Sequence, residues 1–165
     1  MAEIALPRLG PLVYLDEEAL SVLSGFGVCH VFPKGTVIIR EDERQINLYI
    51  TLSGTLEVIT HVNHREVRLA TLGEGDCFGE VAIFEPGTAS ATVRAVEDSQ
   101  LWYLDVDHLQ AFLQEYPHAG CGLILGVNTI LSQRLQQANK LIKTSQIVPG
   151  FLSVRSRRAA AAPTP

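Results

Sequence analysis

Residues 73–95, with the sequence GEGDCFGEVAIFEPGTASATVRA, decide the fold of this chain. The stretch begins with a Gly-Glu-Gly-Asp turn, in which two glycines permit positive φ angles. An apolar segment follows that is long enough for about one helical turn, and Pro86-Gly87 ends it. Small residues at positions 88–92 then lead into a strand. A helix start beside small residues brings free backbone N–H groups together, which predicts an anion site.

This stretch resembles the phosphate-binding cassette of the cyclic-nucleotide-binding domain family. The family includes catabolite activator proteins, regulatory subunits of cAMP-dependent kinase and cyclic-nucleotide-gated channels. The shared motifs, in order, are Gly35, Gly54, Gly73-x-Gly75-Asp76, Phe78-Gly79-Glu80 and Ala91-Thr92-Val93. The resemblance covers residues 15–142. It implies a mainly β fold with flanking helices, an antiparallel β jelly-roll followed by a long C-terminal helix.

The resemblance also implies a ligand, cAMP or cGMP, and a set of binding residues. Glu80 would accept a hydrogen bond from the ribose 2′-hydroxyl, and the Gly79 backbone would line the sugar. Backbone N–H groups of two small residues would hold the phosphate, and a threonine would lie near the phosphate or base. The long helix would close over the base. The implied ligand-binding residues are Phe78, Gly79, Glu80, Val81, Ala82, Ala89, Ser90, Ala91 and Thr92.

One position departs from the family's pattern. The family's cassette usually carries an arginine just before the pair of small residues, and this arginine grips the cyclic phosphate. Counting from Gly79, that position is Ala89 in this chain. Two functions therefore stay open. One is a stand-alone regulatory domain that senses cAMP or cGMP weakly and signals to a partner protein. The other is a degenerate domain that binds no nucleotide and serves as a dimerisation or interaction module. Arg40 and Arg94 are candidates for a replacement cation.

Length and composition exclude several classes of protein. The chain has 165 residues, of which 47% are hydrophobic and 19% charged, as expected of a folded globular domain. Its net charge of −5 argues against a broad nucleic-acid-binding face. Three separated cysteines, the lack of a secretory signal and the lack of a long apolar run predict a cytoplasmic protein without a membrane span.

No arrangement of residues predicts catalysis. The sequence contains no recognisable nucleophile-with-base motif, so we expect no enzyme activity and no resident cofactor. His61 and His64 keep open a third alternative, a cupin-like metalloenzyme, but they fall on an expected hairpin tip without further metal ligands nearby. A solvated turn is the favoured explanation of the two histidines.

The rest of the chain changes from strand periodicity to helical periodicity. Residues 1–14 contain two prolines and predict an N-terminal arm, and residues 15–143 predict the domain with its long helix. After a short helix with Asp16, Glu17 and Glu18 in its first turn, apolar residues alternate between Val28 and Thr71, which predicts short antiparallel strands. Asp105 predicts the start of another helix.

The long helix is expected over residues 117–143, with apolar residues recurring every three or four positions. A stripe containing Val127, Leu131, Leu135 and Ala138 predicts a homodimer in which two copies of the helix pair across a twofold axis. The alternative is that the stripe packs entirely on its own barrel. Residues 144–165 predict a disordered basic tail. Because the chain is too short to hold a winged helix-turn-helix after the long helix, we expect no DNA binding.

Overall fold

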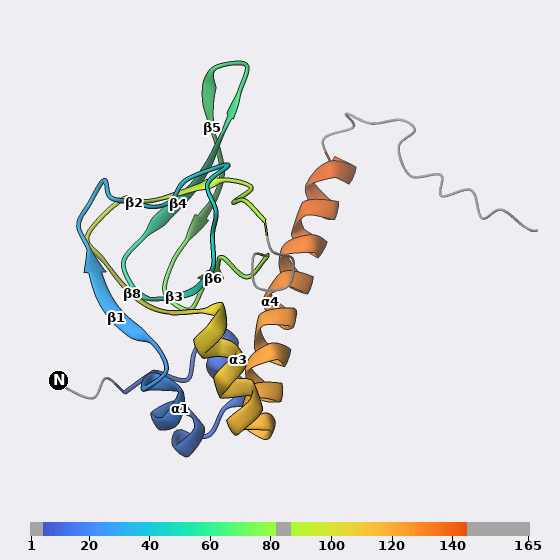
Figure 1. The fold of residues 1–165 in the computed structure, drawn as a ribbon. Helices are drawn as coiled ribbons and strands as arrows, with labels where there is room; N and C mark the ends of the chain where they lie inside the picture. The colour runs from blue at the N-terminus through green and yellow to red at the C-terminus, as the bar shows by residue number, and fades with distance from the viewer. Residues whose placement is uncertain (1–4, 82–86, 145–165) are drawn as a thin grey trace, which may run out of the picture. The chain divides into compact units, whose positions relative to one another are not determined.

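Two antiparallel four-stranded sheets form the body of this computed structural model, which describes residues 5–81 and 87–144 (Figure 1). The first sheet has the order β1-β8-β3-β6, and its strands are β1 (Val28–Phe32), β8 (Ser99–Asp105), β3 (Asn47–Ser53) and β6 (Cys77–Phe78). The second has the order β2-β7-β4-β5, and its strands are β2 (Val37–Ile39), β7 (Thr92–Ala95), β4 (Leu56–Val62) and β5 (Arg65–Leu72). The expected antiparallel β fold is confirmed.

Strand periodicity separates two hydrophobic cores. In β3, Leu48 and Ile50 point toward the helices, whereas Tyr49 points toward the other sheet. Successive side chains of a strand point to opposite faces, so one strand contributes to both cores. Leu56 and Val93 join Tyr49 in the core between the sheets.

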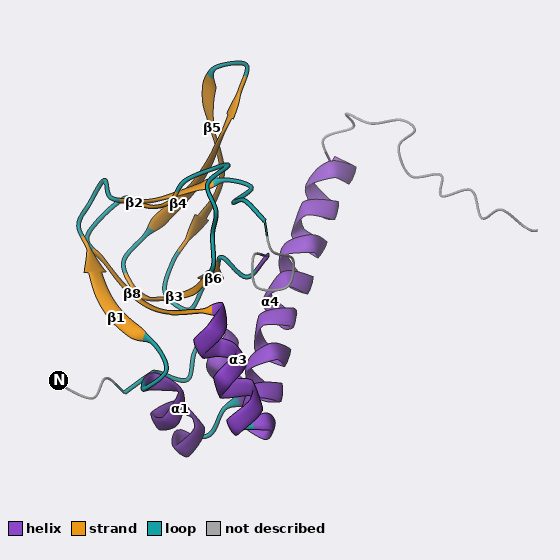
Figure 2. Cartoon of the chain, in the orientation of Figure 1, coloured by secondary structure: helices purple, strands orange, loops and turns teal. Residues whose placement is uncertain are grey.

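The helices of the described residues include a 3₁₀ helix η1 (Gly10–Tyr14), α1 (Glu17–Ser24), α3 (Val106–Glu115) and α4 (Pro117–Thr144). Helices α1 and α3 lie at one end of the sheets and contribute to the first core (Figure 2). Asp16 caps α1 by accepting the Ala19 N–H at 2.8 Å, and Asp105 caps α3 by accepting the His108 N–H at 2.8 Å. Both caps satisfy N–H groups that a helix start otherwise leaves without partners, so these two starts were predictable from sequence.

The N-terminal segment packs into the domain. The sequence predicts an irregular arm over residues 1–14, but Leu6 and Leu12 are buried in the first core together with Leu15. Residues Gly10–Tyr14 form η1, with proline in its first turn. From Ala5 onward, this segment is therefore part of the folded unit rather than an arm beside it.

The first half of α4 also belongs to this core. Val127 is only 2% exposed, and Leu131 packs against the same cluster in part. The expectation that Val127 lies at a twofold interface is therefore wrong, because its own domain already covers it. Residues 133–144 continue the helix as a separate compact unit, in which Leu135 and Leu141 are exposed. Of the expected basic tail, only Thr144, the last residue of α4, is described.

Candidate functional site

The Gly-Glu-Gly-Asp turn is closed by its own aspartate. Asp76 Oδ2 accepts the Gly73 N–H at 2.9 Å, and the Asp76 N–H donates to the Gly73 carbonyl at 3.0 Å. Gly75 has a φ of +83° and donates its N–H to the Thr51 carbonyl at 2.9 Å. The turn is thereby attached to β3 and delivers the chain into β6.

Gly79 follows β6 in a conformation that only glycine adopts readily. Its φ is +80°, and a Cβ at this position would clash with the Asn47 carbonyl oxygen and lie 2.5 Å from Gln45 Nε2. The Gln45 side chain is buried, donates to the Asn47 carbonyl at 2.6 Å and accepts the Ile46 N–H at 2.7 Å. This close approach fixes the chain just before Glu80, which is 7% exposed. A carboxylate held in such a place is a suitable acceptor for a hydroxyl group.

The small residues after position 87 are clamped to the turn at residues 40–44. The Ala89 N–H donates to the Glu43 carbonyl at 2.9 Å, and the Asp42 N–H donates to the Ala89 carbonyl at 2.9 Å. Asp42 has a φ of 65°, in the left-handed region that aspartate enters more readily than most residues. Within residues 5–81 and 87–144, no backbone carbonyl accepts the N–H of Ser90 or Ala91. These two groups can donate to an anion.

Thr92 connects the end of the cassette to β4 through Glu41. Thr92 Oγ1 accepts the Glu41 N–H at 3.0 Å, and the Glu41 carboxylate accepts the Thr60 hydroxyl. The same carboxylate accepts the His61 N–H at 3.3 Å. The hydrogen bond from Thr60 is the main cause that lowers the pKa of Glu41, with smaller contributions from His61. The Thr92 oxygen thus has a structural role in attaching the cassette to residue 41.

Both arginines that the sequence suggests as replacement cations have acidic partners. Arg94 Nε donates to Glu57 at 2.8 Å, and its Nη2 lies 2.8 Å from a Glu66 oxygen. These two carboxylates raise the pKa of Arg94, with the Glu57 hydrogen bond as the largest cause. Arg40 pairs with Glu43 at 3.3 Å. The strand pairing that brings Glu57 opposite Arg94 could not be read from local sequence.

The remaining expected binding residues are Phe78, Val81 and Ala82, and the two that the structure describes differ in burial. Phe78 is buried and stacks on Tyr49, with ring centroids 4.9 Å apart and an interplanar angle of 4°. Val81 is exposed, and Ala82 lies outside the described residues. Gln45 and Glu41, which hold the cassette in place, were not among the expected residues, because only the folded chain brings them to it.

The family model described as "Cyclic nucleotide-binding domain" matches residues 29–116. The chain belongs to the cyclic nucleotide-binding domain family. The Cyclic AMP receptor protein of Thermus thermophilus is 31% identical over 126 residues, which cover 76% of this chain and 56% of the relative. The chain thus spans little more than half the length of that relative.

Solved structures show the same cyclic nucleotide-binding fold. A cyclic nucleotide-binding domain from Methylobacillus flagellatus has a TM-score of 0.77 at 22% identity, covering 84% of this chain and 77% of that one. The regulatory domain of Toxoplasma gondii PKA, crystallised with cAMP, has a TM-score of 0.58 at 30% identity, covering 64% of this chain and 40% of that one.

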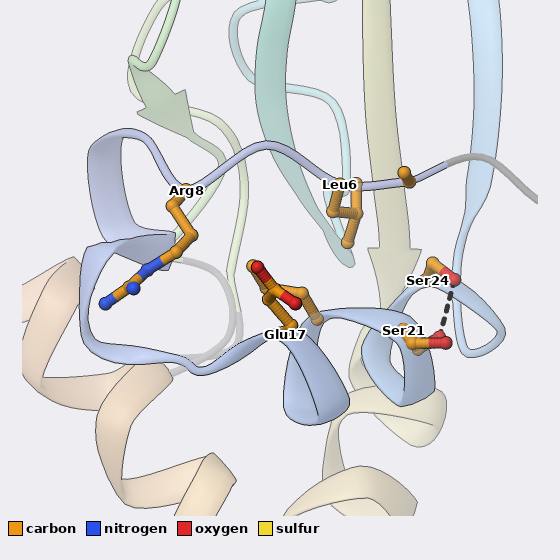
Figure 3. Close-up of a pocket in the computed structure, with 7 residues that line it drawn as sticks. Leu6, Arg8, Glu17, Ser21 and Ser24 are labelled. Atoms are coloured by element: carbon orange, nitrogen blue, oxygen red, sulfur yellow. Dashed lines mark hydrogen bonds between the residues drawn. The ribbon is translucent and has the colours of Figure 1, made fainter.

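A cavity of about 530 Å³ lies elsewhere on this cyclic nucleotide-binding domain, between the N-terminal segment and α1 (Figure 3). Arg8 and Glu17 line it, and the Ser24 hydroxyl donates to the Ser21 carbonyl at its edge. None of its lining residues belongs to the cassette. In the described part of the chain, no three His, Cys, Asp or Glu residues gather as a metal site, and no helix could cross a membrane.

Proposed function

We propose that this domain binds cAMP or cGMP weakly and acts as a regulatory domain that signals to a partner protein. The observation that supports this most directly is the buried Glu80, held behind Gly79 at the start of the cassette. The N–H groups of Ser90 and Ala91 add donors for a phosphate. A hydroxyl acceptor together with anion donors suits a sugar phosphate, the chemistry of the cAMP that the Toxoplasma gondii relative was crystallised with.

The absence of an arginine at Ala89 sets the expected strength of binding. A charged hydrogen bond contributes about 1.5–3 kcal/mol, and about 1.4 kcal/mol changes affinity tenfold. We therefore expect affinity one to two decades below that of an intact cassette, with a Kd on the order of tens of micromolar or poorer. The net charge of −5 favours a protein over nucleic acid as the downstream partner.

Restoring the arginine tests this proposal. In Ala89→Arg, a guanidinium would make a charge-assisted contact with the phosphate, and calorimetric affinity for cAMP or cGMP should rise at least tenfold. Ala89→Gln is the control, because it adds a long polar side chain without the charge and should leave affinity nearly unchanged. Adding Glu80→Ala to Ala89→Arg should remove most of the gain, because the ribose hydroxyl loses its acceptor.

The second candidate function is a dimerisation or interaction module that binds no nucleotide. Ala89 favours it, as do the exposed leucines in the second half of α4, Leu135 and Leu141. These leucines support the proposal of a homodimer formed through that part of the helix. If Ala89→Arg keeps the circular dichroism of the folded protein but binds neither cAMP nor cGMP, the nucleotide proposal fails and the interaction module remains.

A further inference from the structure

The turn at residues 40–44 pairs with the cassette next to Ala89, the position at which the family's pattern has an arginine. Arg44 pairs with Thr88 in an isolated antiparallel bridge. Thr88 directly precedes Ala89, where the family's pattern has arginine. Arg44 is separated from Thr88 by 44 positions in the sequence, so nothing local in the sequence indicates that the two residues are neighbours.

The pattern of hydrogen bonds shows how close this pairing is. The Ala89 N–H donates to the Glu43 carbonyl, so the bond connects the residues flanking the pair. Arg44 and Thr88 are therefore a non-hydrogen-bonded pair, whose Cα atoms lie about 4.5 Å apart with adjacent side chains. Ser90 and Ala91 lie two and three residues beyond Thr88, so an extended arginine side chain at position 44 reaches their N–H groups by running along the paired segment past Thr88.

Among the arginines that lie near the cassette in sequence or in space, Arg44 differs in its partners. Arg94 is engaged by two glutamates and Arg40 by one. Arg44 is exposed, and no ion pair joins it to an acidic residue within the described parts of the chain. Of the three acids in its own turn, Glu43 pairs with Arg40, and Glu41 is bound by Thr60 and His61. The third, Asp42, forms no ion pair with Arg44 within the described residues.

We propose that Arg44 supplies the cation that Ala89 lacks, by placing its guanidinium on the phosphate of the bound cyclic nucleotide. This inference rests on the proposed function and names the residue that supplies a positive charge to the phosphate in this cassette. The hydrogen bonds between Ala89 and residues 42–43 keep Arg44 opposite Thr88, two residues before Ser90, the first of the phosphate donors. The side chain has to be ordered by the ligand, so its contribution is smaller than that of a preorganised arginine.

In this proposal Arg44 recognises the negative charge of the phosphate. A ligand that lacks the phosphate is therefore the appropriate control. Cyclic AMP carries a phosphate, whereas adenosine presents the same base and a ribose without the anion. Arg44 should therefore contribute to cAMP binding and contribute nothing to adenosine binding. This difference separates a phosphate contact from a general effect of the substitution on the shape of the site.

The experiment titrates cAMP and adenosine into the wild-type protein, Arg44→Gln and Arg40→Gln, with circular dichroism to check folding. We expect Arg44→Gln to weaken cAMP binding about tenfold and to leave adenosine binding unchanged. Arg40→Gln is the matched control, since it removes the same charge from the same turn, and it should change cAMP binding less than twofold.

Three results would overturn the inference. If the wild-type protein binds cAMP and Arg44→Gln binds it equally well, Arg44 has no role and the proposed function stands. If Arg40→Gln weakens binding as much as Arg44→Gln, the effect is only the net charge of the turn. If the wild-type protein binds neither cAMP nor cGMP even at millimolar ligand, the proposed function and this inference both fail.

A combination of variants gives an independent check. If Arg44 and an arginine at position 89 serve the same phosphate, each makes the other partly redundant. The gain in cAMP affinity from Ala89→Arg should then be several-fold larger in the Arg44→Gln background than in the wild-type protein. Equal gains in the two backgrounds would show that the two positions act on different parts of the ligand and would refute the proposal.

Discussion

Substituting Gly79 tests whether the close approach at the start of the cassette is real. Gly79 and Gly35 have nearly the same backbone angle, with φ of +80° and +84°. A Cβ at Gly35 would meet nothing within 4 Å, whereas one at Gly79 would meet the Asn47 carbonyl and the Gln45 amide. Gly35→Ala therefore measures the cost of the left-handed conformation alone, and Gly79→Ala measures that cost together with the clash.

The expected magnitudes follow from these surroundings. The left-handed conformation costs an alanine roughly 1–2 kcal/mol, which is the expected loss for Gly35→Ala. In Gly79→Ala, displacement of the buried Gln45 amide breaks its hydrogen bonds and adds roughly 1–3 kcal/mol. The free energy of unfolding should fall by roughly 2–5 kcal/mol in total for Gly79→Ala. In a chain of this size, each kcal/mol lowers the Tm by about 2–4 °C.

Urea denaturation followed by circular dichroism measures both variants. Gly79→Ala should also weaken cAMP binding, because the clash moves Glu80, whereas Gly35→Ala should not. Equal stabilities of the two alanine variants would refute the argument, since the only cost common to both is the backbone angle.

Two further predictions concern the helices. Leu135→Glu should convert a homodimer to a monomer in sedimentation experiments without loss of helix signal, because Leu135 is 64% exposed in the single chain; a wild-type protein that sediments as a monomer at high concentration contradicts the interface. Asp105→Ala should cost about 1 kcal/mol through loss of the α3 cap at neutral pH. The His108 N–H is the main cause that lowers the pKa of Asp105 below 3.8, so Asp105 stabilises the fold above that value. Urea midpoints of wild type and variant should therefore converge as pH falls through the lowered pKa, and a gap that widens in acid would contradict this role.

Local patterns in the sequence determined most of the architecture. Alternating residues between Val28 and Thr71 indicated short antiparallel strands, and Asp105 indicated a helix start, because each signal depends on neighbours within a few positions. The 3₁₀ helix η1 was not expected, because its short sequence has no periodicity and its burial depends on α4 and the sheet.

The cassette was recognisable from the order of its glycines and small residues, and its missing arginine was visible at Ala89. The residues that contact the cassette could not be recognised from the sequence, because they come from distant segments of the chain. Only the tertiary structure showed that Arg94 is held by Glu57 and Glu66. Only the tertiary structure placed Arg44 beside Thr88.

The long helix shows the same division. Its length and its apolar spacing were evident from the sequence, but the surface that covers each leucine or valine was not. Val127 packs into its own domain, while Leu135, eight residues further along, is exposed. Hydrophobic periodicity predicts that one face of a helix is apolar. Which residues of that face are buried depends on the elements that pack against it.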